Sequence, residues 1–186
     1  MKIKGNVLIA RRVFVEKHFG ADSWGRVVRG LPDDVRVLVQ HDSIRNDDWY
    51  PFQFGEKLDR AIVQELGGGD TRIFEGIGAA SAKENLNGAH QALLRPNDPG
   101  AFLAQTSVIY KLYYDTGHRT FELTGPQSAR LTTRDADTFS AIDCLTVIGW
   151  HKEALRMCGA KEVRMTETEC RALAGRWCQY EISWSV

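Results

Sequence analysis

The last quarter of the chain carries four side chains of the types that bind zinc: Cys144, Glu167, Cys170 and Cys178. Zinc in a structural site takes about four nitrogen, oxygen or sulfur ligands and favours thiolates. Three thiolates and one carboxylate would complete such a site and leave no open position for a substrate. The residue types therefore predict a structural, non-catalytic zinc site.

The elements that carry these side chains are expected to turn them toward one interior. Cys144 shares the apolar stripe of a predicted helix with Leu155, and Glu167 continues the strand face on which Met165 lies. Cys178 opens a strict apolar alternation on the next predicted strand. A carboxylate placed among buried residues costs several kcal/mol unless its charge is compensated. A divalent metal ion would compensate it and would clip the helix onto the last hairpin.

The same residues have a purely structural interpretation, which the spacing leaves open. Cysteine is among the most frequently buried residue types, so Cys144 and Cys158 would then be small core residues. Cys170 and Cys178 would face each other as a thiol pair, and Glu167 would be a solvated strand residue. The paired Cys-x-x-Cys pattern of many zinc sites is absent.

Length and composition bound the class of protein. A chain of 186 residues is expected to form one domain, residues 1–186. Its 24 basic and 24 acidic residues balance, which argues against electrostatic binding of nucleic acid. No apolar run reaches the roughly eighteen residues of a membrane span, and no signal peptide is evident. We expect a cytoplasmic location, where thiols stay reduced and serve as ligands or core residues rather than disulfides.

Periodicity predicts an α+β fold, with N-terminal helices packed against a C-terminal antiparallel sheet into which one long helix is inserted. Glycines, prolines and capping residues set the expected ends. The expected helices cover about 7–18, 22–31, 51–66, 70–86 (capped by Asp70), 88–94, 99–114 and 138–158, and residues 32–50 are assigned to helix despite alternating valines. The expected strands cover 119–124, 128–133, 161–169 and 177–184.

Two aromatic groups are candidates for a ligand pocket between helices and sheet. They comprise Trp49, Tyr50 and Phe52 near a helix start, and Tyr110 and Tyr113 near the end of another helix. Apolar ligand sites are usually lined by such side chains. Aromatic residues also dominate the buried area of ordinary cores, so filling the core is the favoured alternative.

The segment Cys144–Trp184 resembles the C-terminal part of 4-vinyl-reductase-type domains. The shared pattern is Glu-x-x-Cys, a turn glycine, and a second Cys that begins an alternating strand ending in Trp. The segment is also similar to the sensor domains of aromatic-responsive transcription activators. That resemblance implies a zinc ion held by three cysteines and a glutamate, which here would be Cys144, Glu167, Cys170 and Cys178.

Over nearly its whole length the chain resembles a myxobacterial domain family of unknown function. The matching segments are KGNVLIARRVFVEKHFG at the start, WYPF at 49–52, GGGD at 67–70 and YYDTG at 113–117. The superfamily also includes haem nitric-oxide sensors and vesicle-tethering (TRAPP) subunits. The Tyr-x-Ser-x-Arg haem signature and the phenol-binding histidine and tryptophan find no match here, so neither ligand is carried over.

These observations favour a regulatory or sensory domain that binds a small apolar ligand or a protein partner. The alternative is a TRAPP-like scaffold subunit that acts only through protein contacts. We do not expect an enzyme, because no nucleophile–base pair or cofactor loop is evident. The long helix carries a second apolar stripe that would face another helix or a second subunit, and we expect a homodimer. The stripe consists of Val147, Trp150, Ala154 and Met157.

Overall fold

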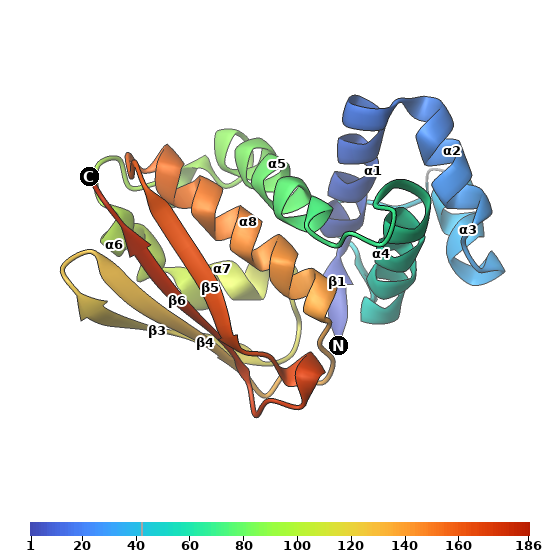
Figure 1. Cartoon of the computed structure of the whole chain (residues 1–186). Helices are drawn as coiled ribbons and strands as arrows, with labels where there is room; N and C mark the ends of the chain where they lie inside the picture. Colours follow the sequence, from blue (N-terminus) through green and yellow to red (C-terminus); the bar gives the residue numbers. More distant parts are fainter. Residues whose placement is uncertain (42) are drawn as a thin grey trace.

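The computed structural model describes residues 1–41 and 43–186. It confirms the predicted α+β architecture, with helices in the first half and an antiparallel sheet in the second (Figure 1). The helices are α1 (Gly5–Phe19), α2 (Ala21–Arg29), α3 (Asp33–Gln40), α4 (Phe52–Leu66), α5 (Ile73–Asn87), α6 (Pro99–Leu103), α7 (Thr106–Tyr113) and α8 (Ala141–Met157), with 3-10 turns η1 (Gln91–Leu93) and η2 (Arg171–Leu173). The strands are β1 (Lys2–Lys4), β2 (Trp49–Pro51), β3 (His118–Gly125), β4 (Ser128–Arg134), β5 (Val163–Glu169) and β6 (Cys178–Trp184).

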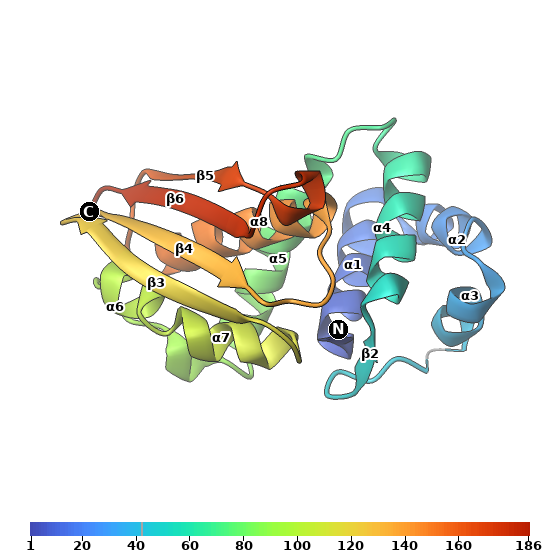
Figure 2. The ribbon, with the colours of Figure 1, turned by 90° about the horizontal axis from the view of Figure 1, so that it is seen from below.

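The main sheet has the strand order β3-β4-β6-β5, and each neighbouring pair is antiparallel. Helices α5 to α8 lie together on one side of it (Figure 2). The alternation predicted for β6 is present, since Cys178, Tyr180, Ile182 and Trp184 are all buried. Along β5, Val163 and Met165 are buried while Arg164 and Thr166 are exposed. One face of the sheet therefore builds the core.

Helices α5 and α8 cross at very short range, and glycines at the crossing allow their backbones to approach closely. A Cβ added at Gly149 would lie 1.9 Å from the carbonyl oxygen of Glu75, and one at Gly78 would lie 2.1 Å from that of Thr146. This packing buries Val147, Trp150 and Ala154 within the chain. The second stripe of α8 is thus largely covered within the chain, where the Trp150 ring also contacts Phe102 and Tyr113. It lends no support to the predicted homodimer, which stays a prediction.

We expect Gly149→Ala to lower the free energy of unfolding by about 2–3 kcal/mol, because the added methyl group would meet backbone atoms and force α5 and α8 apart. Gly25→Ala in α2 is the matched control: its nearest neighbour would be the flexible Arg29 side chain at 3.6 Å. The control should be neutral or stabilising, since alanine is the better helix former. Urea unfolding of the two variants measures the difference, and equal stabilities would contradict the close crossing.

A buried ion pair ties the N-terminal helices to the rest of the core. Arg11 in α1 is 1% exposed, and its Nε donates to Oδ1 of Asp59 in α4 at 2.5 Å while Nη2 donates to Oδ2 at 3.0 Å. Nη2 also lies 3.5 Å from Oδ1 of Asp143 in α8. The hydroxyl of Tyr114 donates to the other oxygen of Asp143 at 2.7 Å. These paired charges fix the positions of α1, α4 and α8 relative to one another.

Three details of the expected secondary structure are wrong. Residues 32–50 are not one helix: α3 ends at Gln40, and β2 (Trp49–Pro51) pairs with the unpredicted β1, while position 42 lies outside the described residues. The alternation there was misleading because Val35 and Val39, four apart, share the buried helix face and Val37 is exposed.

The other two errors concern helix ends. Asp70 does not cap α5, which begins at Ile73; its carboxylate instead accepts from the Arg72 backbone N–H at 2.9 Å and from the Arg72 guanidinium. The helix expected over 99–114 is divided into α6 and α7.

Where residues are described, the helices are all too short or too polar to cross a bilayer.

Candidate metal centre

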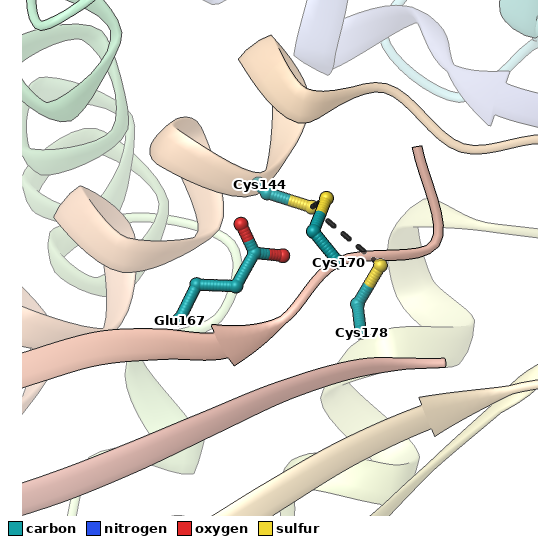
Figure 3. Close-up of side chains that lie close together, drawn as sticks. All are labelled: Cys144, Glu167, Cys170 and Cys178. Atoms are coloured by element: carbon teal, nitrogen blue, oxygen red, sulfur yellow. Dashed lines mark hydrogen bonds between the residues drawn. The ribbon is translucent and has the colours of Figure 1, made fainter. Parts of the chain in front are cut away.

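The four predicted ligands converge between α8 and the last hairpin (Figure 3). Cys144 comes from the first turns of α8, Glu167 from the end of β5, Cys170 from the residue before η2, and Cys178 from the start of β6. One ligand atom from each lies within 4.8 Å of the other three. The cysteines are at most 7% exposed and Glu167 is half-buried. The cluster can hold a metal ion.

The sulfur–sulfur distances fit a tetrahedral zinc site. Zinc–sulfur bonds of about 2.3 Å in tetrahedral geometry place two sulfurs about 3.8 Å apart. Sγ of Cys144 lies 3.7 Å from Sγ of Cys178 and 4.0 Å from Sγ of Cys170. These are non-bonded distances, so the cysteines are free thiols and no disulfide competes. In addition, the buried Oε1 of Glu167 has no hydrogen-bond partner among the described residues, as expected of an oxygen that serves as a metal ligand.

In the absence of a metal ion the three thiols of the cluster differ in pKa. Hydrogen bonding to Cys170 and Cys178, together with burial, raises the pKa of Cys144 well above its usual value. Hydrogen bonds from Cys144 lower the pKa of Cys170 to about 6 and that of Cys178 to about 7. Burial raises the pKa of Glu167 to about 7. Two of the thiols are thus readily ionised at neutral pH, which favours metal binding.

The backbone of the hairpin is shaped to present these ligands. The register between β5 and β6 shifts between Glu167 and Glu169, which redirects the end of β5. At the turn, Gly175 donates its N–H to the carbonyl of Cys170 at 2.9 Å, and a Cβ at Gly175 would lie 2.7 Å from that oxygen. The Arg171 N–H points at Sγ of Cys178 at 3.5 Å. The turn glycine of the sequence pattern is therefore a steric requirement.

The fourth cysteine has a structural position. Cys158 is fully buried just after α8, outside the ligand cluster. The core interpretation therefore holds for Cys158. For Cys144 the simple core interpretation does not account for its two short sulfur contacts.

The predicted ligand-pocket residues are not brought together into one site. Tyr110 and Tyr113 line a cavity of about 50 Å³ among α1, α5, α7, α8 and β3. Phe52 lines a second cavity of about 40 Å³, which it shares with Tyr110 but not with Tyr113. Trp49 is 37% exposed beneath the Lys4 ammonium, and the Tyr50 hydroxyl accepts the Arg45 backbone N–H at 2.9 Å. Trp49 and Tyr50 thus lie at β2, apart from both cavities.

Three residues that line the 50 Å³ cavity were not among the predicted pocket residues: Arg119, Trp150 and His151. Arg119 is 5% exposed and its Nε donates to Oγ1 of Thr133 at 2.8 Å. His151, 2% exposed, lies outside the ligand cluster, and its Nδ1 donates to the Val147 carbonyl oxygen at 2.9 Å. The sequence pattern could have indicated part of this, because Arg119 and Phe121 are two apart on a strand and therefore share its inward face.

Arg119 also lies on the wall of the 40 Å³ cavity, which reaches Cys144 and Cys178. Tyr110, Tyr114 and Val147 are likewise shared by the two cavities. The metal centre and the 50 Å³ cavity are therefore separated by one layer of shared side chains.

Acid should destabilise the protein partly through His151. Burial, reinforced by the nearby positive charge of Arg119, lowers the pKa of His151 to about 3. The unfolded chain has the ordinary value of about 6.5, so it binds more protons than the folded chain between about pH 6.5 and 3, and stability falls as the pH falls through that window. By pH 5 this site accounts for a loss of about 2 kcal/mol.

Urea unfolding at pH 7 and pH 5 measures this loss, with His151→Gln as the variant that cannot titrate. The wild type should lose more stability between the two pH values than the variant. Equal losses would show that His151 is already protonated when buried.

Comparison with known proteins places this geometry in a class. H-NOX proteins share the fold: that of K. algicida in its Fe(II) unliganded state is 11% identical with a TM-score of 0.75, covering 98% of this chain and 97% of that one. The H-NOX protein from S. oneidensis in the Fe(II)NO state is 15% identical with a TM-score of 0.72, covering 98% and 99%. The chain is thus an H-NOX-like α+β domain with a three-cysteine, one-glutamate cluster.

Within that class, the chain belongs to the family described as "Protein of unknown function (DUF2378)", whose model matches residues 83–185. The matched region contains all four residues of the cluster. No curated protein matches the chain.

The residues of this chain do not fit a haem. The 50 Å³ cavity has room for about four water-sized atoms, far fewer than a porphyrin contains. The shared fold therefore brings no haem chemistry to this chain.

Proposed function

We propose that this chain is a regulatory domain, related to 4-vinyl-reductase-type domains, in which a structural zinc ion fixes the helix α8 to the β5–β6 hairpin. The observation that carries the proposal is the convergence of three sulfurs and a carboxylate oxygen within 4.8 Å. Cys144, Glu167, Cys170 and Cys178 would supply all four ligands. The ion would contribute folding free energy and no catalytic chemistry.

The regulatory input is proposed to be a small ligand in the 50 Å³ cavity, bounded by Tyr110, Tyr113 and Trp150. This volume is smaller than the few hundred Å³ typical of sites for drug-sized molecules. The ligand is accordingly small, or its entry widens the cavity. Because Arg119 and Tyr110 also border the cavity at the metal centre, a ligand that moves them would alter the surface of the hairpin.

A thermal-shift screen tests the ligand proposal. Small apolar and aromatic molecules should raise the melting temperature of the zinc-loaded protein, because a ligand that binds only the folded state stabilises it. Trp150→Phe, on the cavity wall, should weaken the shift, and Trp49→Phe, apart from the cavity, should leave it unchanged. No shift from any compound would contradict a ligand-binding function.

The second candidate is a scaffold subunit that acts only through protein contacts. Such a subunit would use exposed apolar side chains as contacts, and the chain exposes several on α1, α3, α7, β3 and η2, namely Val13, Phe19, Val37, Val108, Leu123 and Leu173. A stable partner in a pull-down that is lost on Val13→Asp, together with a flat ligand screen, would favour the scaffold. We propose under either function that the chain binds and does not catalyse, and that light scattering will detect a homodimer.

A further inference from the structure

The 50 Å³ cavity has an apolar frame but polar atoms without partners. Among the described residues, the buried Nε2 of His151, Nε1 of Trp150 and Oγ1 of Thr146 form no hydrogen bond. The Tyr113 hydroxyl lies near Asn85 and Trp150 without a bond of ordinary geometry to either. Each unsatisfied buried polar atom costs about 1–3 kcal/mol, so several on one wall call for a common partner.

Arg119 adds a positive charge to this wall. Its guanidinium packs 5.1 Å from the ring centre of Tyr110, and in the described chain no carboxylate lies within 4 Å of it. Asp143, on the neighbouring helix, is engaged by Arg11 and by the Tyr114 hydroxyl. Buried arginines are normally paired with an acid, because an unpaired buried charge is costly. An anion in the cavity would supply the missing charge.

The hydrogen-bonding groups on the cavity wall and the cavity volume indicate which anion would fit. Arg119 and Trp150 are donors only, and the Tyr113 and Thr146 hydroxyls either donate or accept. Neutral His151, whose Nδ1–H donates to Val147, presents Nε2 as an acceptor. Room for about four water-sized atoms matches formate, acetate or bicarbonate, and bicarbonate also carries the O–H that Nε2 can accept.

We infer that this cavity is a binding site for a small carboxylate or carbonate-type oxyanion, held by Arg119, Trp150 and the Tyr113 and Thr146 hydroxyls, with His151 accepting any proton that the anion carries. The inference rests on the proposed function in using the same cavity, and it specifies the chemical class of the ligand.

The test is calorimetric titration and thermal shift of the zinc-loaded protein with sodium formate, acetate and bicarbonate, against sodium chloride at equal ionic strength. Acetamide is the uncharged match for acetate. The oxyanions should stabilise the protein saturably and acetamide should not. Arg119→Met should raise the dissociation constant roughly ten- to a hundredfold with the metal content unchanged. Arg130→Met, a surface arginine on β4 paired with Glu181, should bind like the wild type.

Equal shifts with chloride, or binding unaffected by Arg119→Met, would overturn the inference and leave water in the cavity. Loss of metal in Arg119→Met with no anion effect would assign Arg119 to charge balance at the metal centre instead. If Arg119→Met does not fold, the wild-type protein alone provides the test. Saturation-transfer NMR should then detect bound acetate, and added formate should displace it. If neutral apolar molecules bind and oxyanions do not, the inference fails while the proposed function stands; if neither binds, both fail.

Discussion

Cys178→Ser is expected to abolish metal binding and to lower the free energy of unfolding by at least about 5 kcal/mol, because binding free energies of structural zinc sites are of order 10 kcal/mol and add to folding. Cys178 contributes a sulfur 3.7 Å from that of Cys144 and begins the strand that the ion would tie to α8. A serine hydroxyl is a poor substitute for a thiolate on zinc. Metal analysis and urea unfolding measure the two losses.

Cys158→Ser is the matched control for that experiment. It makes the same chemical change at a fully buried cysteine of the same region, outside the ligand cluster. It should cost only the few kcal/mol of placing a hydroxyl in the core and should keep the metal. If both serine variants retain metal, or if both lose it, the assignment of ligands is wrong.

Asp59→Asn should lower the free energy of unfolding by about 3–5 kcal/mol, the usual cost of leaving one partner of a buried ion pair without its counter-charge. Asp59 is 1% exposed and holds Arg11 through both carboxylate oxygens. The remaining interaction of Arg11 with Asp143, at 3.5 Å, is too long to replace it. Chemical unfolding of the purified variant gives the value.

The surface pair of Asp34 and Lys57 provides the comparison for Asp59. Asp34→Asn removes an ion pair whose side chains are 50% and 35% exposed, and it should cost far less stability than Asp59→Asn because solvent screens the pair. The double variant Arg11→Met with Asp59→Leu should recover much of the stability lost in Asp59→Asn, since neither charge then stays buried alone. A loss below about 1 kcal/mol for Asp59→Asn itself would show that water reaches the pair.

The sequence predicted the metal cluster because each ligand sits in an element with strong local patterning. The apolar stripe of α8 and the alternation of β6 orient Cys144 and Cys178, and the hairpin turn fixes Cys170 near them. Local periodicity determines which way such residues face. That is enough information when three of the four ligands come from one hairpin.

The cavity could not be predicted in the same way. Its polar wall joins Arg119 on β3, Thr146 and His151 on α8, and Tyr113 on α7, and their meeting depends on how closely helices pack. Gly78 and Gly149 set that separation, yet a single glycine in a helix carries no sequence signal for its partner. The aromatic run that begins at Trp49 suggested a pocket by composition alone, but the β1–β2 pairing places Trp49 and Tyr50 outside both cavities, and only Phe52 is buried.

X-ray absorption at the zinc edge, on protein purified under reducing conditions with its metal content determined, tests the central claim most directly. About one zinc per chain is predicted, with three sulfurs at about 2.3 Å and one oxygen at about 2.0 Å. Freshly reduced, folded protein that contains no metal, or a zinc ion surrounded only by nitrogen and oxygen, would contradict it.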